Sequence, residues 1–357
     1  MSIKKLAKDT LQLLHSDKRI LTILNDTNTY LEKHPETKNQ IQEYEWTLRS
    51  LSELSPLTPE KIFSGFIFPL TEAEYEVESS IVLCKIGFYK HAIVSLRNVL
   101  ELGLLSVYWD INDQSHIDIQ NWLKSMESTP FRKTIFNKLR ENKYIKVFDE
   151  KKAIFDKTAT LYERLSNFSH TKGAMYSSRG LNAHNSNVNN FTESSLKKWL
   201  KIMREVVEVV TIFHILKYPV ALQYTPLDEK FGLNGPAGGF IQPNQVERIK
   251  RIISPELLEE LQKISDNDPS AVSMAAWVND QPDITKADFE LQIENQDKQS
   301  IEWEGYDHWL KNQKRLYSYL RKKSFTEYKE KLSYLKRMRV WAKKNNFLKS
   351  PQKRTIS

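Results

Sequence analysis

Residues 91–109 read HAIVSLRNVLELGLLSVYW, and this stretch decides the fold class of the chain. Apolar side chains occupy most of its positions, whereas Arg97 and Glu101, four residues apart, share one face with Asn98 beside them. The pattern predicts a helix from about Lys90 to Trp109 that is buried on most sides and carries one polar stripe. The simplest interpretation of that stripe is an ion pair between Arg97 and Glu101.

A second informative stretch, Leu161-Tyr-Glu-Arg-Leu-Ser-Asn-Phe-Ser-His170, is amphipathic at helical spacing. We expect one long helix over residues 150–170, capped by Thr171-Lys-Gly173. His170 then lies on the polar face, where it is open to solvent, a partner or a substrate. Alternatively, it is present because its protonated form complements the helix dipole. The expected apolar stripe comprises Ile154, Thr158, Leu161, Leu165 and Phe168, and the polar side comprises Asp156, Glu163, Asn167 and His170.

The composition indicates an all-α protein. Ten glycines and thirteen prolines are few for 357 residues, which favours long helices over strands joined by turns. The single cysteine, Cys84, lies in an apolar run and excludes an intrachain disulfide, in keeping with a cytoplasmic location. The most apolar stretch, 206–222, is interrupted by charges and Pro219, so we expect no membrane span. We find no metal-ligand cluster in the sequence and expect no cofactor.

Further helices follow from capping and breaking signals. Thr71 with acids after it predicts a helix start, and Thr192 predicts the cap of a long helix that Pro219 ends. Glycine-rich residues 233–240 lack the spacing of a phosphate-binding loop and predict a turn. Shorter helices are expected over 117–126 and 131–140, and a helical segment over 245–264.

The two opening stretches together resemble the HEPN family, a helical fold that includes many metal-independent ribonucleases. Its plan has a helix of the form Ala-x-x-x-x-Arg-x-x-x-Glu, matched by Ala92, Arg97 and Glu101, and a later helix with Arg-x(4–6)-His, matched by Arg164 and His170. The likeness covers roughly residues 70–215. The commonest spacing would place the arginine at Leu165, so the form here is a variant.

The resemblance implies a homodimer in which two histidines meet over RNA. His170 would be the acid–base group for attack of a ribose 2′-hydroxyl, because imidazole titrates near neutrality. Arg164 would stabilise the phosphate, and Glu101, Ser166 and Asn167 would support them. Such a protein would be an endoribonuclease of the toxin or phage-defence kind that needs no metal.

Charge divides the C-terminal part of the chain. Residues 254–307 hold fourteen acids and three lysines, whereas residues 311–357 hold sixteen lysines and arginines and two acids. Aromatic residues alternate with these cations, a pattern typical of nucleic-acid binding, although a solvated face or pairing with the acidic segment would have the same composition. The candidate nucleic-acid contacts are Lys314, Arg315, Arg321, Lys322, Lys323, Lys336, Arg337, Arg339, Lys343 and Lys344.

The sequence therefore predicts four regions. They are an N-terminal helical extension (1–56), a HEPN-like core (57–225), an acidic helical segment (226–310) and a basic, aromatic-rich helical tail (311–357). The leading functional hypothesis is an RNA-directed protein, with endoribonuclease activity as its sharpest form. The alternative is a non-catalytic helical adaptor that binds a protein or a nucleic acid through the tail, and a protein encoded by a neighbouring gene is one possible partner.

Overall fold

The computed structural model describes residues 17–56, 58, 64–112, 117–182, 190–232 and 237–349. Every regular element within these ranges is a helix, and no strand occurs among them. The all-α fold expected from the composition is therefore confirmed. The described residues divide by their contacts into two compact units: unit 1 within 1–228 and 233–281, and unit 2 within 229–232 and 282–357. The expected boundary between the acidic segment and the basic tail, at 310/311, followed charge, whereas these units follow packing.

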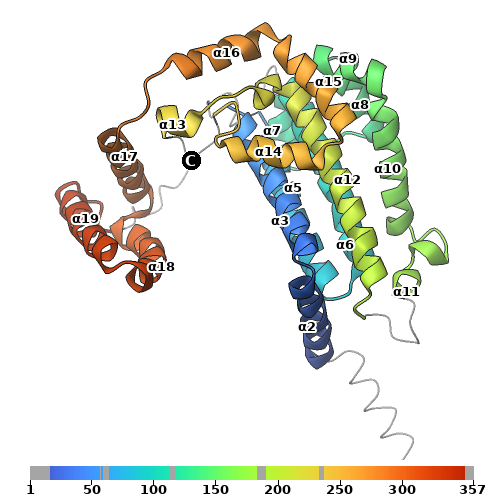
Figure 1. Cartoon of the computed structure of the whole chain (residues 1–357), viewed down its shortest axis with the longest axis horizontal. Coiled ribbons are helices and arrows are strands. Elements are labelled where there is room, and N and C mark those ends of the chain that lie inside the picture. The colour runs from blue at the N-terminus through green and yellow to red at the C-terminus, as the bar shows by residue number, and fades with distance from the viewer. Residues whose placement is uncertain are drawn as a thin grey trace, which may run out of the picture. The chain divides into compact units, whose positions relative to one another are not determined.

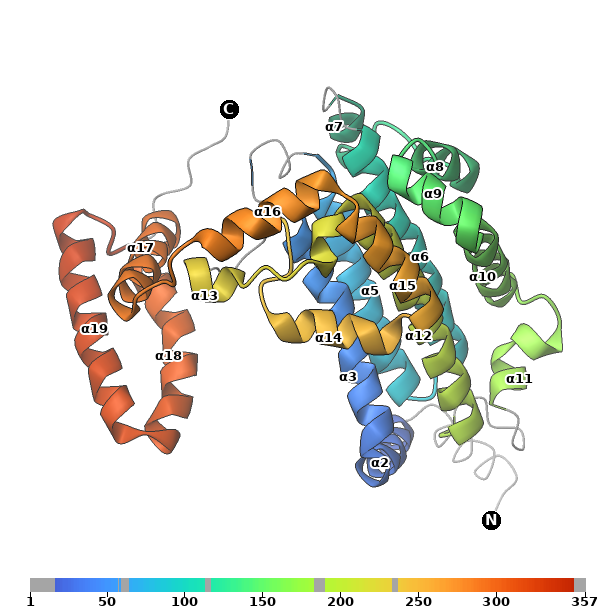
Figure 2. The same ribbon diagram turned by 45° about the horizontal axis from the view of Figure 1, so that its top comes forward.

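Unit 1 is built around α6 (Tyr89–Asn112), which packs against α5 (Ile67–Lys85), α12 (Glu193–Lys217) and α10 (Ile154–Ser169). Figures 1 and 2 show α3 (Pro35–Ser50), α5, α6 and α12 running side by side. Most of the apolar residues in 91–109 are buried, as their pattern predicted, and Val94 and Leu102 are partly buried. Each helix thus removes an apolar face from water, which is the main stabilising contribution to such a bundle.

A close contact joins α6 to α12. A methyl group built on Gly103 would lie 2.6 Å from a side-chain carbon of Val210, closer than real atoms approach. Glycine at this position lets the two helix backbones approach, because it carries no side chain to separate them. Further helices of unit 1 are α2 (Asp17–Lys33), η1 (Leu51–Leu54), α7 (Ile117–Leu123), α8 (Arg132–Leu139), α9 (Lys143–Lys152), η2 (Ala174–Tyr176), α11 (Ser178–Leu181), η3 (Pro219–Leu222), α14 (Pro243–Ile252), α15 (Pro255–Asp266) and α16 (Pro269–Asp280).

Helix α6 also has the length and apolar composition of a membrane span over Tyr89–Ile111. However, 72% of its most apolar window is buried inside the protein, which is the arrangement of a core helix in a helical bundle.

Some helix boundaries differ from expectation. α5 begins at Ile67 instead of Thr71, because Pro69 is tolerated in the first turn, where backbone N–H groups lack helical partners. The single helix expected over 150–170 is wrong. Ala153 adopts a left-handed conformation (φ 49°), which ends α9 and starts α10. The segment over 245–264 is likewise divided, into α14 and α15, by Ser254 before Pro255.

Unit 2 contains α17 (Lys286–Glu304), α18 (Tyr306–Lys323) and α19 (Phe325–Lys344), together with part of α13 (Leu227–Phe231). Asp297 of α17 accepts hydrogen bonds from the indole of Trp309 (2.8 Å) and the hydroxyl of Tyr334 (2.6 Å), so one carboxylate links all three long helices. Unit 2 has a small apolar core of its own, which consists of Ile301, Tyr306, Trp309, Tyr317, Leu335, Met338 and Ala342.

Candidate functional site

His170 lies at the C-terminal cap of α10. The backbone N–H of Thr171 donates to the carbonyl of Phe168 (3.3 Å), and that of Lys172 donates to the carbonyl of Asn167 (3.0 Å). This is a Schellman motif, and Thr171 takes its left-handed position (φ 50°) instead of the glycine we expected. The motif fixes the backbone at His170, while its side chain is exposed and has no hydrogen bond or ion pair to any described residue.

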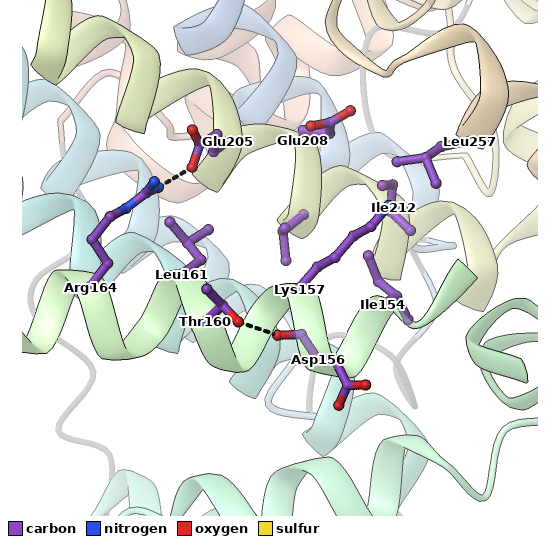
Figure 3. A pocket seen from close by; sticks show the side chains of 11 residues that line it. Ile154, Asp156, Lys157, Thr160, Leu161, Arg164, Glu205, Glu208, Ile212 and Leu257 are labelled. Carbon is purple, nitrogen blue, oxygen red and sulfur yellow. Dashed lines mark hydrogen bonds and ion pairs between the residues drawn. The ribbon is translucent and has the colours of Figure 1, made fainter. Parts of the chain in front are cut away.

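Arg164 points to the other side of α10. Its guanidinium forms an ion pair with Glu205 of α12, and the two side chains are 37% and 30% exposed. Figure 3 shows this pair at one end of an open cavity of about 440 Å³, which also receives Lys157 from α10 and Leu257 from α15. The arginine is thus neutralised within unit 1. A phosphate would have to compete with Glu205 for it.

Glu101 lies on α6, apart from both His170 and Arg164, and pairs with Arg97. The Nε of Arg97 donates to Glu101 at 3.0 Å, which confirms the ion pair expected from their spacing. The Nη2 of Arg97 donates to the hydroxyl of Tyr162 at 2.9 Å. Burial, with Glu101 nearby, raises the pKa of the Tyr162 hydroxyl, so this hydroxyl stays protonated at neutral pH. Tyr162, two residues before Arg164, is the part of α10 that faces Glu101.

Helix geometry separates these groups within one chain. Lys90 donates to the Thr171 hydroxyl (2.5 Å), so the end of α10 lies beside the start of α6. Glu101 is eleven residues further along α6, roughly 16 Å at 1.5 Å per residue. Ser166 and Asn167 are half-buried, and their carbonyls accept the backbone N–H groups of His170 and Lys172. His170, Arg164 and Glu101 therefore do not converge in the single chain.

The basic tail forms α18 and α19. Arg321, Lys322 and Lys323 are exposed next to the turn between the helices, and along α19 the exposed candidates are Lys336, Arg337, Arg339, Lys343 and Lys344. Lys314 and Arg315 lie within α18, and their side chains are outside the described part of the structure. Among the lysine and arginine side chains described on these two helices, Arg337 alone forms an ion pair, with Glu294 at 3.2 Å.

A second histidine is buried. The hydroxyl oxygen of Ser106 lies 3.0 Å from the Nε2 of His214, and the Nδ1 of His214 lies 2.8 Å from the carbonyl oxygen of Val210. Complete burial lowers the pKa of His214 to about 4, which keeps the imidazole neutral. With no access to solvent, it packs the core and is not a candidate for catalysis. No group of three or more acidic, histidine or cysteine side chains suited to a metal ion occurs among the described residues.

Three residues that contact the predicted site residues or their neighbours were not predicted from the sequence. They are Tyr162, Glu205 and Arg132, whose guanidinium lies 4.8 Å from the centre of the Tyr162 ring. Spacing on one helix gives no signal for contacts between helices far apart in the chain. Comparison with protein-family models, curated proteins and solved structures finds no match to this chain.

Proposed function

We propose that this chain is an RNA-binding protein whose binding surface is formed by α18 and α19. The observation that supports the proposal is the set of exposed cations on these helices that lack carboxylate partners among the described residues. Lysine and arginine side chains in this state attract phosphates and release counterions on binding.

Exposed aromatic residues accompany the cations. Tyr319 is 61% exposed and Phe325 is 62% exposed, and Arg321, Lys322 and Lys323 lie between them in sequence. Aromatic faces of this kind stack on unpaired bases, and the cations track the backbone of a single strand. The combination favours single-stranded RNA over a duplex, because stacked bases inside a duplex are closed to such contacts.

The test is fluorescence anisotropy with a labelled single-stranded RNA, titrated at several salt concentrations. The triple variant Arg321→Gln, Lys322→Gln, Lys323→Gln should bind at least tenfold more weakly. The slope of log affinity against log salt should fall by about 2, since each lost phosphate contact contributes about 0.7 for a single strand.

A matched control removes three charges elsewhere. Lys197, Lys250 and Lys263 of unit 1 are exposed but are ion-paired with Glu193, Glu247 and Glu259. The triple variant Lys197→Gln, Lys250→Gln, Lys263→Gln should keep most of the affinity. Equal losses in both variants would mean that net charge alone drives binding, and the proposed surface would be wrong.

A second candidate function is metal-independent cleavage of RNA with His170 as the acid–base group. It is favoured by the imidazole of His170, which is exposed on a fixed helix end and has no partner among the described residues, so a second copy of the chain could approach it. The test is digestion of a mixed RNA pool in EDTA by the wild type and by His170→Ala. Cleavage that survives chelation and disappears in the variant would support it, whereas binding without cleavage would leave the adaptor function.

A further inference from the structure

A pocket of about 420 Å³ lies in unit 1 between α5, α6, α8 and α10, and every residue that lines it belongs to unit 1. Its volume is in the range of small-molecule sites. The walls combine apolar side chains with a few polar groups that converge on it. The polar groups are Glu76, Arg97, Asn98, Glu101, Thr129, Arg132 and Tyr162.

Two guanidinium groups meet at one ring in this pocket. The Cζ of Arg97 lies 5.1 Å, and that of Arg132 4.8 Å, from the centre of the Tyr162 ring. The two arginines differ in their ion pairing. Glu101 neutralises Arg97, whereas Arg132 has no carboxylate partner among the described residues. Arg132 is exposed at the pocket and available to an anion.

Further aromatic side chains line the pocket. Trp122 is held by a hydrogen bond from its indole N–H to the hydroxyl of Thr129 (3.1 Å). Phe131, next to Arg132 in sequence, lines the same pocket and is 82% exposed. An apolar ring left in water is unfavourable, and a flat ligand stacked on it would remove that surface from water.

Hydrogen-bond acceptors complete the pocket. The side-chain amide of Asn98 donates to Glu76 of α5 (2.9 Å), and the carbonyl oxygen of Asn98 and the second oxygen of Glu76 form no hydrogen bond or ion pair with a described side chain. Such oxygens suit an N–H group on the ligand's ring.

We propose that this pocket binds a small planar anion, an aromatic ring that carries a carboxylate or a phosphate. Arg132 binds the anionic group, the ring stacks beside Trp122 and Phe131, and Glu76 with Asn98 accepts a hydrogen bond from the ring. This site is independent of RNA binding through α18 and α19.

The test is isothermal titration calorimetry of the full chain with four probes. AMP carries a ring and a phosphate, 4-aminobenzoate carries a ring and a carboxylate, adenosine carries no charge, and inorganic phosphate carries no ring. At least one ring anion should bind tenfold or more tightly than adenosine and phosphate, and the preferred one distinguishes phosphate from carboxylate ligands.

Two variants assign the site. Arg132→Gln should weaken binding of that probe at least tenfold, while Lys133→Gln, which removes an exposed neighbouring charge outside the pocket, should leave it unchanged. Absence of binding by both ring anions would overturn the proposal. Binding that Arg132→Gln leaves intact would also overturn it, because AMP would then be held elsewhere, such as on the basic helices.

Discussion

Arg164 and Glu205 form an ion pair that joins α10 to α12, although the sequence suggested Arg164 as a partner of His170. Both side chains are about one-third exposed, so we expect the pair to contribute at most about 1 kcal/mol to the free energy of unfolding. Glu205→Gln should therefore fold normally in urea titrations. If Arg164 acts on RNA, this variant should also bind or cleave RNA more strongly, because the guanidinium is released. If Glu205→Gln instead lowers the free energy of unfolding by several kcal/mol, the ion pair serves mainly to stabilise the fold.

Gly103→Ala should destabilise the protein by about 1–3 kcal/mol, because the added methyl would meet Val210 of α12. Helix propensity alone predicts the opposite sign, since alanine is favoured over glycine by about 1 kcal/mol. Urea denaturation followed by circular dichroism measures the difference. A variant more stable than the wild type would show that α6 and α12 can separate at no cost.

Thr171→Gly should raise the free energy of unfolding by about 1 kcal/mol, because a β-branched residue is strained in the left-handed conformation. The substitution also removes the hydroxyl that accepts a hydrogen bond from Lys90. Thr171→Ala separates the two effects, because it removes the hydroxyl and keeps a side chain at positive φ. A thermal midpoint for Thr171→Gly at or below that of Thr171→Ala would contradict the expected strain.

Glu74→Gln should alter how stability depends on pH. Burial raises the pKa of Glu74 from 4.5 to about 7, and Arg49, 3.6 Å away, opposes the shift. The folded state therefore retains a proton that the unfolded state releases between these values. This contribution to stability is complete below about pH 4.5 and is lost as the pH rises through 7.

The glutamine variant cannot lose that proton. Relative to the wild type it should become more stable between pH 4 and pH 8, by at most about 3 kcal/mol at 1.36 kcal/mol per unit. Urea titrations of both proteins at several pH values measure this change. A difference that stays constant over the range would show that Glu74 has the same pKa in the folded and unfolded states.

Much of the fold followed from periodicity. The apolar stripe of Ile154, Leu161, Leu165 and Phe168 is buried, as expected. α12 ends at Lys217, two residues before Pro219, which was expected to end it. The break at Ala153 could not be predicted, because neither glycine nor proline marks it. It is stabilised by Asp149, whose side chain accepts the backbone N–H of Phe155 (3.0 Å).

The candidate site was less predictable than the helices. The ion pair of Arg97 with Glu101 follows from their spacing on one helix, and it is present. The partner of Arg164 could not be predicted from spacing on one helix. Glu205 lies 41 positions later in the chain and contacts Arg164 only because α12 packs on α10. Sequence patterns describe faces of single helices, whereas a site depends on which faces meet.

Unit 2 is discontinuous in the chain. The backbone N–H of Ile284 donates to the carbonyl of Glu229 (2.9 Å), the amide of Gln292 donates to Phe231 (3.0 Å), and Lys230 pairs with Asp283 (2.8 Å). A truncation after Gln281 would therefore remove α17–α19 yet leave residues 229–232 behind without their partners. Deletion mapping in chain order would therefore damage both parts. If the chain is cut between Gln281 and Pro282 instead, we expect the two fragments to stay associated, because residues 229–232 of the first fragment keep their contacts with the second.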